Sequence, residues 1–481
     1  MVNAEEFARE LRARIDSHFE WLLVSSTGAT FPLRRDEIEI SAQAEKTLLT
    51  VLDDSGIGVS RVLKLNNDPG PPEISIEVRR QFAKSSETIR LVPRTPASQL
   101  SLNVEFARLE RANSIAAGLL ELFPEYKLSR LALNVENGRL AQIFLRDPRG
   151  VEVAVMADVT ATMIHEAVMT TAMLWREKLQ LRKKPINEIW IAGERKQIRN
   201  VRKLVGLFHQ NIAARFRIFE VADDAGRPTV KELQKPEFRT LWREKAKKIT
   251  LPAEIRPSRT AERILGLSPR VTDVIFSKQG ETIRFLGLPF ARVRTVAGDE
   301  KAWFGIDRDR RPLNENSWSE LAELVRQLGV YRSADTPNKR HEFYRASPES
   351  WLESILRRNI RRLDANLILS PIYNQFRASS DKIDLLAIRR DGRLVIIELK
   401  TSPDRETVFQ AADYWRKIEI QRRRGELARV RAFGEMEIQD KPALVYAVAP
   451  ALSFHRDFGY FAQALRREIE MWRFELREDW R

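Results

Sequence analysis

A two-residue turn between two apolar runs most constrains the fold of the C-terminal part of this chain. Asp391 and Gly392 separate the runs at 383–390 and 393–400. An Asp-Gly pair accommodates the positive backbone φ angles of a tight turn, so the sequence predicts an antiparallel hairpin. A strand at 367–376 precedes this hairpin. Ser347 and Pro348 before it are typical of a helix start.

Charged groups gather at one end of the predicted hairpin. Asp384 begins the apolar run of one strand, and Glu398 and Lys400 end the other. Residues i and i+2 of a strand point to the same face, so Glu398 and Lys400 share a face and Leu399 turns away from it. The hairpin brings Asp384 beside Glu398. Carboxylate oxygens suit Mg²⁺, and an ammonium can orient water and offset developing charge. The pattern favours metal-assisted phosphodiester hydrolysis.

These residues resemble a known family. Asp384, thirteen intervening residues and then Glu398–Leu399–Lys400 resemble the PD-(D/E)XK nuclease superfamily, which has the restriction-endonuclease-like fold. The hairpin sequence is also similar to the nuclease domain of the NucS mismatch endonucleases. Ile383 stands where the name of the motif has proline. The resemblance covers residues 348–450.

The flanking helices add a second part to the resemblance. An upstream helix with Glu353 and a downstream Gln410-x-x-x-Tyr414 look like the RecB-type branch of the superfamily. The resemblance implies that Glu353 faces the site and that Gln410 and Tyr414 brace it. The predicted catalytic residues are Asp384, Glu398, Lys400, Glu353, Gln410 and Tyr414. The implied ligands of Mg²⁺, with Mn²⁺ as an alternative, are Asp384, Glu398 and the backbone carbonyl of Leu399.

Other interpretations of these residues stay open. The hairpin charges could form a cross-strand ion pair on a surface. Glu353 could be a solvated acid near a helix N-terminus, with Glu349 competing for its role. Gln410 and Tyr414 could simply pack beside Trp415. Asp381 competes with Asp384.

The net charge and the lack of cysteine limit the partners and the chemistry that this chain can have. Lys and Arg number 82 against 67 Asp and Glu, a net charge of +15, which favours a nucleic-acid partner. The absence of cysteine excludes disulfides, cysteine-ligated zinc, iron–sulfur clusters and thiol nucleophiles. Residues from Glu349 onward hold 25 basic and 21 acidic side chains, so most of the excess charge lies upstream.

Two groups of bases are predicted to contact DNA phosphates. The first forms an expected i, i+4 stripe on the helix after Pro348, and its members are Arg357, Arg358, Arg361 and Arg362. The second lies on a basic helix over 195–213, and its members are Arg195, Lys196, Arg199, Arg202 and Lys203. A solvated helix face is the alternative for the first group.

The sequence predicts an α/β multidomain fold with four zones. Residues 1–98 are expected to form a β-rich domain, and 99–222 an α/β domain whose first helix spans 105–122. Residues 223–346 are expected to form a basic connector with a small β-rich module. Residues 347–481 are the predicted nuclease domain, with a mixed sheet in the order helix, three strands, helix, strand.

The α/β zone at 99–222 has the same expected element order as the last domain. Asp158–Val159–Thr160 holds the place of Glu398–Leu399–Lys400 and contains no lysine. We therefore consider a degenerate second copy of the nuclease fold, kept for DNA binding or dimerisation. A convergent α/β domain is the alternative.

The resulting functional prediction is a Mg²⁺-dependent DNA endonuclease of repair, recombination or phage defence. The sequence contains no P-loop, so an ATPase or helicase would have to come from another chain. A homodimer could supply a second cut. Without a signal peptide or membrane span, the expected location is the cytoplasm. The alternatives are a catalytically silent DNA-binding or assembly protein with a nuclease fold, and a nuclease that acts on RNA.

Overall fold

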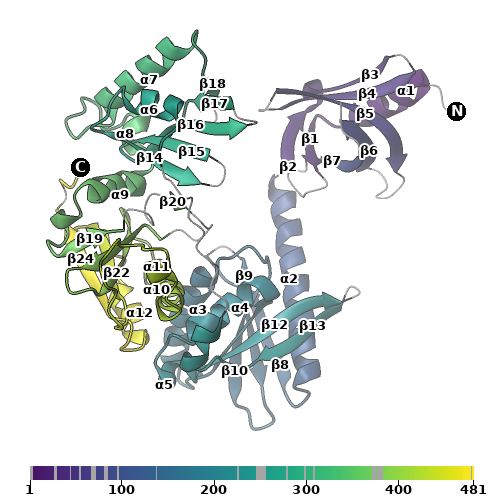
Figure 1. The fold of residues 1–481 in the computed structure, drawn as a ribbon. Coiled ribbons are helices and arrows are strands. Elements are labelled where there is room, and N and C mark those ends of the chain that lie inside the picture. The colour runs from purple at the N-terminus through teal and green to yellow at the C-terminus, as the bar shows by residue number, and fades with distance from the viewer. Residues whose placement is uncertain are drawn as a thin grey trace. The chain divides into compact units, whose positions relative to one another are not determined.

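The protein is a mixed α/β chain with several sheets, seen here in a computed structural model (Figure 1). The residues that the structure describes are 4–25, 30–43, 45–53, 56–66, 72–80, 85–94, 97–136, 138–224, 227–244, 256–277, 280–296, 299–306, 309–370, 376–377, 383–477 and 479–481. Asp381, the competitor of Asp384, lies outside them. The chain divides into two compact units, 1–107 and 108–481. None of the described helices combines the length and apolar character needed to cross a membrane.

The first unit is built on one antiparallel sheet. The strands run β1 Glu20–Val24, β2 Thr30–Arg34, β3 Ile38–Gln43, β4 Lys46–Asp53, β5 Gly56–Asn66, β6 Ile74–Arg80 and β7 Glu87–Pro93. Their order is β2-β1-β7-β6-β5-β4-β3. Helix α1 (Ala4–Ile15) buries Ala8, Leu11 and Ile15, whose spacing forms one apolar stripe, against this sheet. A 3₁₀ turn, η1, spans Arg35–Glu37.

Helix α2 (Ala97–Leu122) begins in the first unit and ends in the second. The expected start at residue 105 is therefore too late, because the stretch after Pro96 continues as helix. That stretch contains Ala97, Gln99 and Leu100, which are good helix formers.

The second unit opens with a six-stranded sheet, which we call the middle sheet. Its elements are β8 Lys127–Leu133, β9 Leu140–Arg146, β10 Glu152–Asp158, α3 His165–Gln180, β11 Ile189–Glu194, α4 Arg195–Val205, α5 Gln210–Ala213, β12 Phe216–Asp224 and β13 Arg227–Leu233. The order is β13-β12-β11-β10-β9-β8. Strands β8, β9 and β10 are antiparallel, and β10, β11 and β12 are parallel. Helix α2 covers one face, and α3 and α4 cover the other.

The C-terminal sheet carries the predicted site. Its elements are α9 Pro348–Arg358, β19 Leu367–Leu369, β21 Leu385–Arg389, β22 Leu394–Leu399, α10 Thr407–Arg423, α11 Glu426–Arg429, β23 Leu444–Pro450, α12 Phe458–Ala464 and β24 Met471–Leu476. The order is β19-β21-β22-β23-β24, antiparallel through β22 and parallel beyond it. Helix α9 packs on one face and α10 on the other.

A small module lies between these sheets in the sequence. It follows the 3₁₀ turn η2 (Phe238–Arg243) and consists of α6 Arg259–Leu265, β14 Thr272–Ser277, β15 Gly280–Phe285, β16 Leu288–Val296, β17 Asp299–Phe304, β18 Arg311–Pro312, α7 Trp318–Tyr331 and α8 Glu342–Arg345. Strand β20 (Phe376–Arg377) pairs in parallel with β14. The strand expected over 367–376 begins where predicted, but its length is wrong: β19 ends at Leu369, and Phe376 belongs to β20, which pairs with the edge strand β14 of a different sheet.

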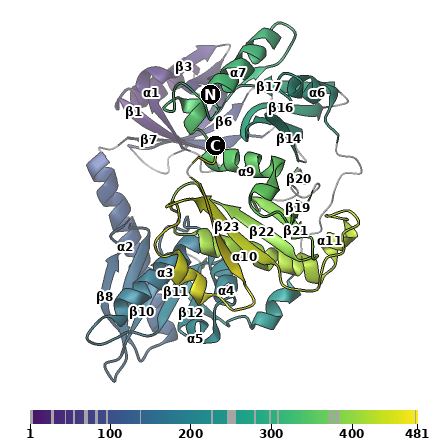
Figure 2. The same ribbon diagram turned by 90° about the vertical axis from the view of Figure 1, so that its left-hand side faces the viewer.

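The middle and C-terminal sheets share one hydrophobic core. Helices α3 and α4 of the first lie beside α10 of the second (Figures 1 and 2). These three helices and α12 contribute buried side chains to the core. Among them are Met169, Val201, Phe409 and Phe461. Strands β8 to β12 and the five strands of the C-terminal sheet also have the same order and the same directions.

Candidate active site

The β21–β22 hairpin positions the charged residues. Leu385 pairs with Ile397, and extending this register by one residue sets Asp384 opposite Glu398. The turn requires glycine at 392, where φ is +83° and an added Cβ would lie 2.7 Å from the carbonyl oxygen of Glu437. The turn thereby pins the register that aligns the two carboxylates.

The two faces of β22 have different neighbours. Leu394 and Ile396 point into the core that contains α10, whereas Ile397 and Leu399 point into the core that contains α9. Alternation places Glu398 on the α10 face, at the end of a strand that is otherwise fully apolar. Its side chain is only 3% exposed. The alternative interpretation, in which the hairpin charges form an ion pair on the protein surface, is therefore wrong, because Glu398 is buried away from water.

Few hydrogen bonds compensate these buried charges. The backbone N–H of Leu399 donates to Asp384 Oδ2 at 2.8 Å. Lys400 Nζ lies 3.5 Å from Glu398 Oε1 and 2.9 Å from Asp404 Oδ2. Glu398 Oε2 and Gln410 Oε1 are buried and have no hydrogen-bond partner among the described residues. Two oxygens thus have lone pairs that no described residue satisfies.

The pKa values follow from this geometry. Burial raises the pKa of Asp384 to about 7; the Leu399 N–H opposes the rise, and the charge of Glu353 adds to it. Burial, and next the charge of Asp384, hold the pKa of Glu398 well above its ordinary value. Two carboxylates at a buried site repel each other, and a hard cation between them would relieve that repulsion.

Lys400 stays charged at this site. Burial alone would lower the pKa of its ammonium, but Glu398 and Asp404 raise the pKa above the ordinary value. An ammonium that holds its proton can position water and offset negative charge, but it cannot serve as a general base at neutral pH. Asp404 was not predicted; its signal in the sequence is its position four residues after Lys400.

Glu353 lies on α9 and is buried, so the solvated alternative for it is wrong. Its Oε1 is 3.2 Å from Arg284 Nη1 and 3.5 Å from Arg357 Nη1. Arg284 comes from β15 and also binds Asp273 at 2.7 Å. Glu353 therefore joins the module to the C-terminal sheet and adds negative charge near Asp384. Its competitor Glu349 is exposed in the first turn of α9.

Gln410 and Tyr414 lie one turn apart on α10. Burial raises the pKa of Tyr414 above its ordinary range, and the next contributions come from Glu398 and Asp384. The phenol therefore keeps its proton close to both carboxylates. The structure thus brings both residues of the Gln-x-x-x-Tyr pattern to the α10 side of the charged cluster.

A second polar cluster adjoins the site and was not predicted. His165 and Glu166 begin α3, and their ligand atoms lie within 4.8 Å of those of Asp413 on α10. Arg416 and Lys417 already bind Asp413 at 2.8 and 2.9 Å. These two cations neutralise the carboxylate, which makes the cluster a poor match for a metal ion.

The bases predicted on the first helix are arranged differently from expectation. Helix α9 ends at Arg358, because Asn359 has a φ of −147°, and Arg361 and Arg362 lie in a separate 3₁₀ turn, η3 (Ile360–Arg362). The continuous stripe is therefore wrong. Asn side chains compete for backbone hydrogen bonds and favour helix ends, which is the signal that predicts this stop.

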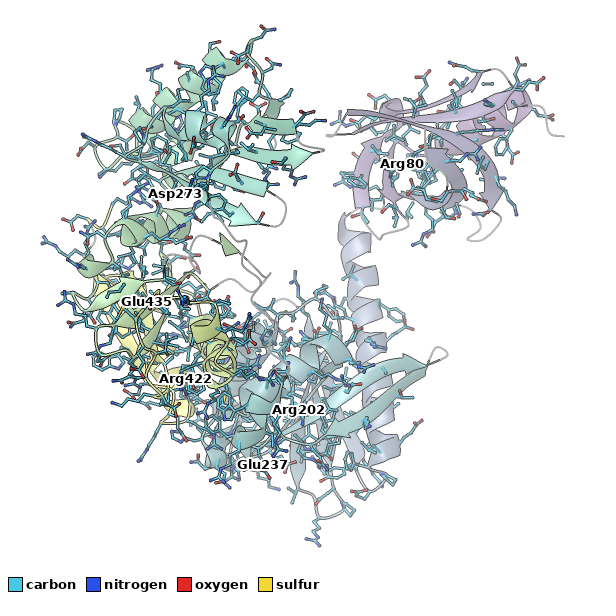
Figure 3. All side chains as sticks on the ribbon, viewed as in Figure 1. Arg80, Arg202, Glu237, Asp273, Arg422 and Glu435 are labelled. Atoms are coloured by element: carbon cyan, nitrogen blue, oxygen red, sulfur yellow. The ribbon has the colours of Figure 1, made fainter. Side chains whose placement is uncertain are left out.

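Most of the bases predicted on α4 have partners within the protein. Arg199 lies 3.0 Å and Arg195 4.0 Å from Glu220, and Lys203 lies 2.7 Å from Glu244. Arg202, labelled in Figure 3, donates to the carbonyl of Gln234. Among the described residues, only Lys196 of this group lacks a partner. These contacts offset much of the charge that was expected to face DNA.

Fold and site together define a multidomain α/β protein with a buried carboxylate–lysine cluster at the end of the central hairpin of a sheet. No protein-family model and no curated protein matches the chain. Among solved structures, the chain is similar to EndoMS in its apo form, with 11% identity and a TM-score of 0.14, over 39% of this chain and 84% of that one. It is also similar to a repair endonuclease from Pyrococcus abyssi, with 10% identity and a TM-score of 0.13, over 40% and 85%.

Proposed function

We propose that the chain is a Mg²⁺-dependent endodeoxyribonuclease whose C-terminal domain, from residue 347, has the restriction-endonuclease-like fold. The observation that carries this proposal is the buried cluster of Asp384, Glu398 and Lys400, with Glu398 Oε2 unsatisfied among the described residues. A sheet flanked by α9 and α10, with the cluster on its central hairpin, supports the fold assignment.

Asp384 and Glu398 would hold the metal ion, with the carbonyl of Leu399 as a third oxygen ligand. All these donors are oxygens, as Mg²⁺ prefers, and Mn²⁺ tolerates the same ligands. When bound, the ion supplies Lewis-acid stabilisation to a phosphodiester. The raised pKa values of both carboxylates show how strongly their negative charges lack compensation in the protein alone.

The protein groups around the ligands orient the reactants. Asp404 holds the Lys400 ammonium at 2.9 Å, which aims it at the Glu398 end of the site. Lys400 would position the attacking water and offset the charge that develops on the phosphate. The protonated Tyr414 would donate a hydrogen bond toward the carboxylates and keep their lone pairs oriented.

The test compares Lys400→Ala with Lys441→Ala, which removes an exposed lysine from the same domain. Linear, nicked, mismatched and branched DNA are incubated with each protein in Mg²⁺, in Mn²⁺ and in EDTA. We expect Lys400→Ala to lower cleavage at least ~100-fold, because it removes a group that acts on charge in the transition state. Lys441→Ala should match the wild type.

The same assay separates the alternatives. DNA binding without metal-dependent cleavage by the wild type would support a silent binding or assembly protein. Cleavage of matched RNA strands in preference to DNA would support an RNA-directed nuclease. Equal activity of wild type and Lys400→Ala would contradict the assigned site.

A further inference from the structure

The middle sheet and the C-terminal sheet share more than strand order. In each, the first helix covers one face, as α2 and α9 do. In each, the helix after the third strand covers the other face, as α3 and α10 do. A third helix follows the fourth strand in both, namely α4 and α12. Each of the five strands of the C-terminal sheet thus has a counterpart among β8 to β12, whereas β13 at the edge of the middle sheet has none.

The two sheets also meet through counterpart segments. Phe208, after α4, forms an antiparallel bridge with Leu465, after α12. The N–H of His209 donates to Ala464 O at 3.0 Å, and the N–H of Arg466 donates to Leu207 O at 2.9 Å. If the segment after α4 and the segment after α12 exchange places, each of these two hydrogen bonds takes the position of the other. Any antiparallel bridge has this reciprocity. What is specific here is that the bridged segments follow the counterpart helices α4 and α12, as an interface with two-fold symmetry requires.

Side-chain contacts follow the same exchange. Phe208, from the segment after α4, packs against Phe409 of α10 at a centroid distance of 5.4 Å. On the other side of the bridge, Tyr460 of α12 donates to the carbonyl of Met173 in α3 at 3.3 Å. The segment after α4 thus contacts α10, and α12 contacts α3. The arrangement resembles a dimer interface contained in one chain.

The middle copy lacks the chemistry of the C-terminal one. Asp158 ends β10 on the face of α3, as Glu398 does on the face of α10, and it pairs with Leu140. Leu140 therefore stands where Asp384 stands, and Thr160 stands where Lys400 stands. Asp158 Oδ1 accepts bonds from the N–H of Thr160 at 2.9 Å and of Ala161 at 3.1 Å, so its carboxylate stabilises a loop.

We infer that one chain contains a complete nuclease pair with one active and one silent member, and that it therefore cuts one DNA strand per encounter. This inference rests on the proposed function. The silent copy packs on the face of α10 and α12, so a second chain cannot form the same pair there. A double-strand break would then require a second, independent encounter.

Supercoiled plasmid distinguishes the outcomes. With Mg²⁺ and full-length protein, we expect open-circular DNA to accumulate before any linear DNA appears, at a rate proportional to protein concentration. Linear DNA formed directly, or a rate that rises with the square of concentration, would overturn the inference. No cleavage at all would instead refute the proposed function, so the two failures are distinguishable.

Mixing provides a second readout. With DNA in excess, adding Lys400→Ala protein to wild type should leave the nicking rate unchanged, because no active pair forms between chains. A rate that falls with the added fraction would show that two chains share a reaction, and would overturn the inference even if nicks accumulate.

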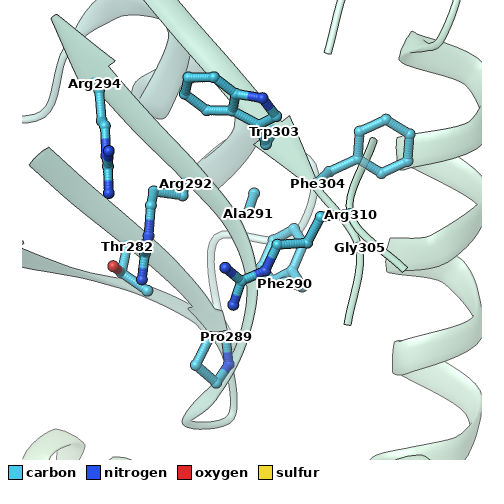
Figure 4. Close-up of a pocket in the computed structure, with 10 residues that line it drawn as sticks. All are labelled: Thr282, Pro289, Phe290, Ala291, Arg292, Arg294, Trp303, Phe304, Gly305 and Arg310. Carbon is cyan, nitrogen blue, oxygen red and sulfur yellow. The ribbon is translucent and has the colours of Figure 1, made fainter. Parts of the chain in front are cut away.

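An independent observation concerns the small module. A cavity of about 250 Å³ opens on the sheet formed by β15, β16 and β17 (Figure 4). Its polar lining comes from Thr282, Arg292, Arg294 and Arg310, and its aromatic lining includes Trp303. Register sets Thr282, Arg292 and Trp303 in one row across the three strands. One row thus combines two hydrogen-bond donors with an aromatic ring.

The cavity arginines are uncompensated. None of the three, Arg292, Arg294 and Arg310, has an acidic partner among the described residues. Burial lowers the pKa of Arg292, and the charges of Arg310 and Arg294 lower it further. An anion in the cavity would relieve this mutual repulsion.

Other arginines of the module are paired. Arg263 lies 2.9 Å from Glu315, Arg311 lies 2.9 Å from Glu320, and Arg326 lies 2.7 Å from Glu323. The unpaired charge is therefore a property of the cavity and not of the whole module.

We propose that this cavity binds a phosphate of a single nucleic-acid strand, with a neighbouring base stacked on Trp303. Guanidinium groups bind phosphate oxygens through paired hydrogen bonds, and aromatic side chains stack on bases of any sequence. The combination suits a single strand better than a duplex, whose bases are already stacked.

The test measures binding of labelled single-stranded and duplex oligonucleotides by anisotropy in EDTA, so that cleavage plays no part. The triple variant Arg292→Gln/Arg294→Gln/Arg310→Gln is compared with Arg263→Gln/Arg311→Gln/Arg326→Gln, which removes the same charge from paired positions. We expect the cavity variant to bind single strands at least ~10-fold more weakly and to reduce the salt slope by about 2, at ~0.7 per phosphate. The control should change affinity less than ~2-fold.

Trp303→Ala should weaken single-strand binding more than duplex binding. Equal effects of the two triple variants would overturn the proposal. Unchanged affinity of the cavity variant for single strands and for duplexes would also overturn the proposal. An acidic protein partner would then be the remaining ligand for the cavity. Thermal melting of each variant shows whether it is folded.

Discussion

At the scale of single residues, the site is defined by charge that the fold leaves uncompensated. Asp384 receives one backbone hydrogen bond, and Glu398 has one oxygen without a partner among the described residues. Burying a carboxylate without full compensation costs free energy. A cation restores the balance, so metal affinity and stability are linked.

This linkage predicts how stability depends on pH. Without metal, the pKa of Asp384 is about 7 in the folded protein against an ordinary value of 3.8. The folded state then binds more protons than the unfolded state between these values. The free energy of unfolding therefore falls as pH rises through this window, by about 1.4 kcal/mol per pH unit at most for this group.

Denaturant unfolding in EDTA from pH 4.5 to 8 measures the effect. Asp384→Asn removes the titrating group, so we expect its stability to fall less steeply with rising pH than that of the wild type. Saturating Mg²⁺ should flatten the wild-type curve near pH 7. Identical slopes for both proteins in EDTA would contradict the raised pKa.

At the scale of elements, the β21–β22 hairpin depends on its turn. Gly392 and Gly434 both have positive φ angles, of +83° and +65°. An added Cβ at Gly392 would meet the Glu437 carbonyl at 2.7 Å, whereas nothing lies within 4 Å of one at Gly434. Alanine at either position would incur the cost of a positive φ angle, but only at Gly392 would its Cβ also clash with a neighbouring atom.

Alanine at each position separates the two penalties. We expect Gly434→Ala to lower the free energy of unfolding by about 1–2 kcal/mol, which is the cost of the left-handed conformation. Gly392→Ala should cost more and should also lower nuclease activity, because the turn holds the register of Asp384 and Glu398. Chemical denaturation and plasmid cleavage measure both. A Gly392→Ala protein no less stable than Gly434→Ala would show that the turn yields easily.

Element boundaries show where local signals are sufficient. The Asp-Gly turn and the apolar runs of 383–400 predict the hairpin, because both signals act between neighbouring residues. The strand expected over 367–376 instead divides between two sheets. Phe376, at its end, pairs with Phe276 of β14, a hundred residues earlier in the chain, and no local pattern contains that information.

At the scale of the second unit, one core joins the middle and C-terminal sheets. Its helices α3, α4, α10 and α12 are buried on the faces that meet. Their apolar residues predict burial, because an amphipathic helix must cover its apolar stripe. The complementary shapes of the two faces decide which helix packs against which.

The sequence alone determined the hairpin, the common face of Glu398 and Lys400 and the proximity of Asp384, because strand alternation and a two-residue turn are local rules. Only the tertiary structure decided that Glu353 binds Arg284, 69 residues away. It also decided that Phe208 meets Leu465. Such contacts depend on how whole sheets pack, and residues far apart in the chain leave no spacing from which to predict them.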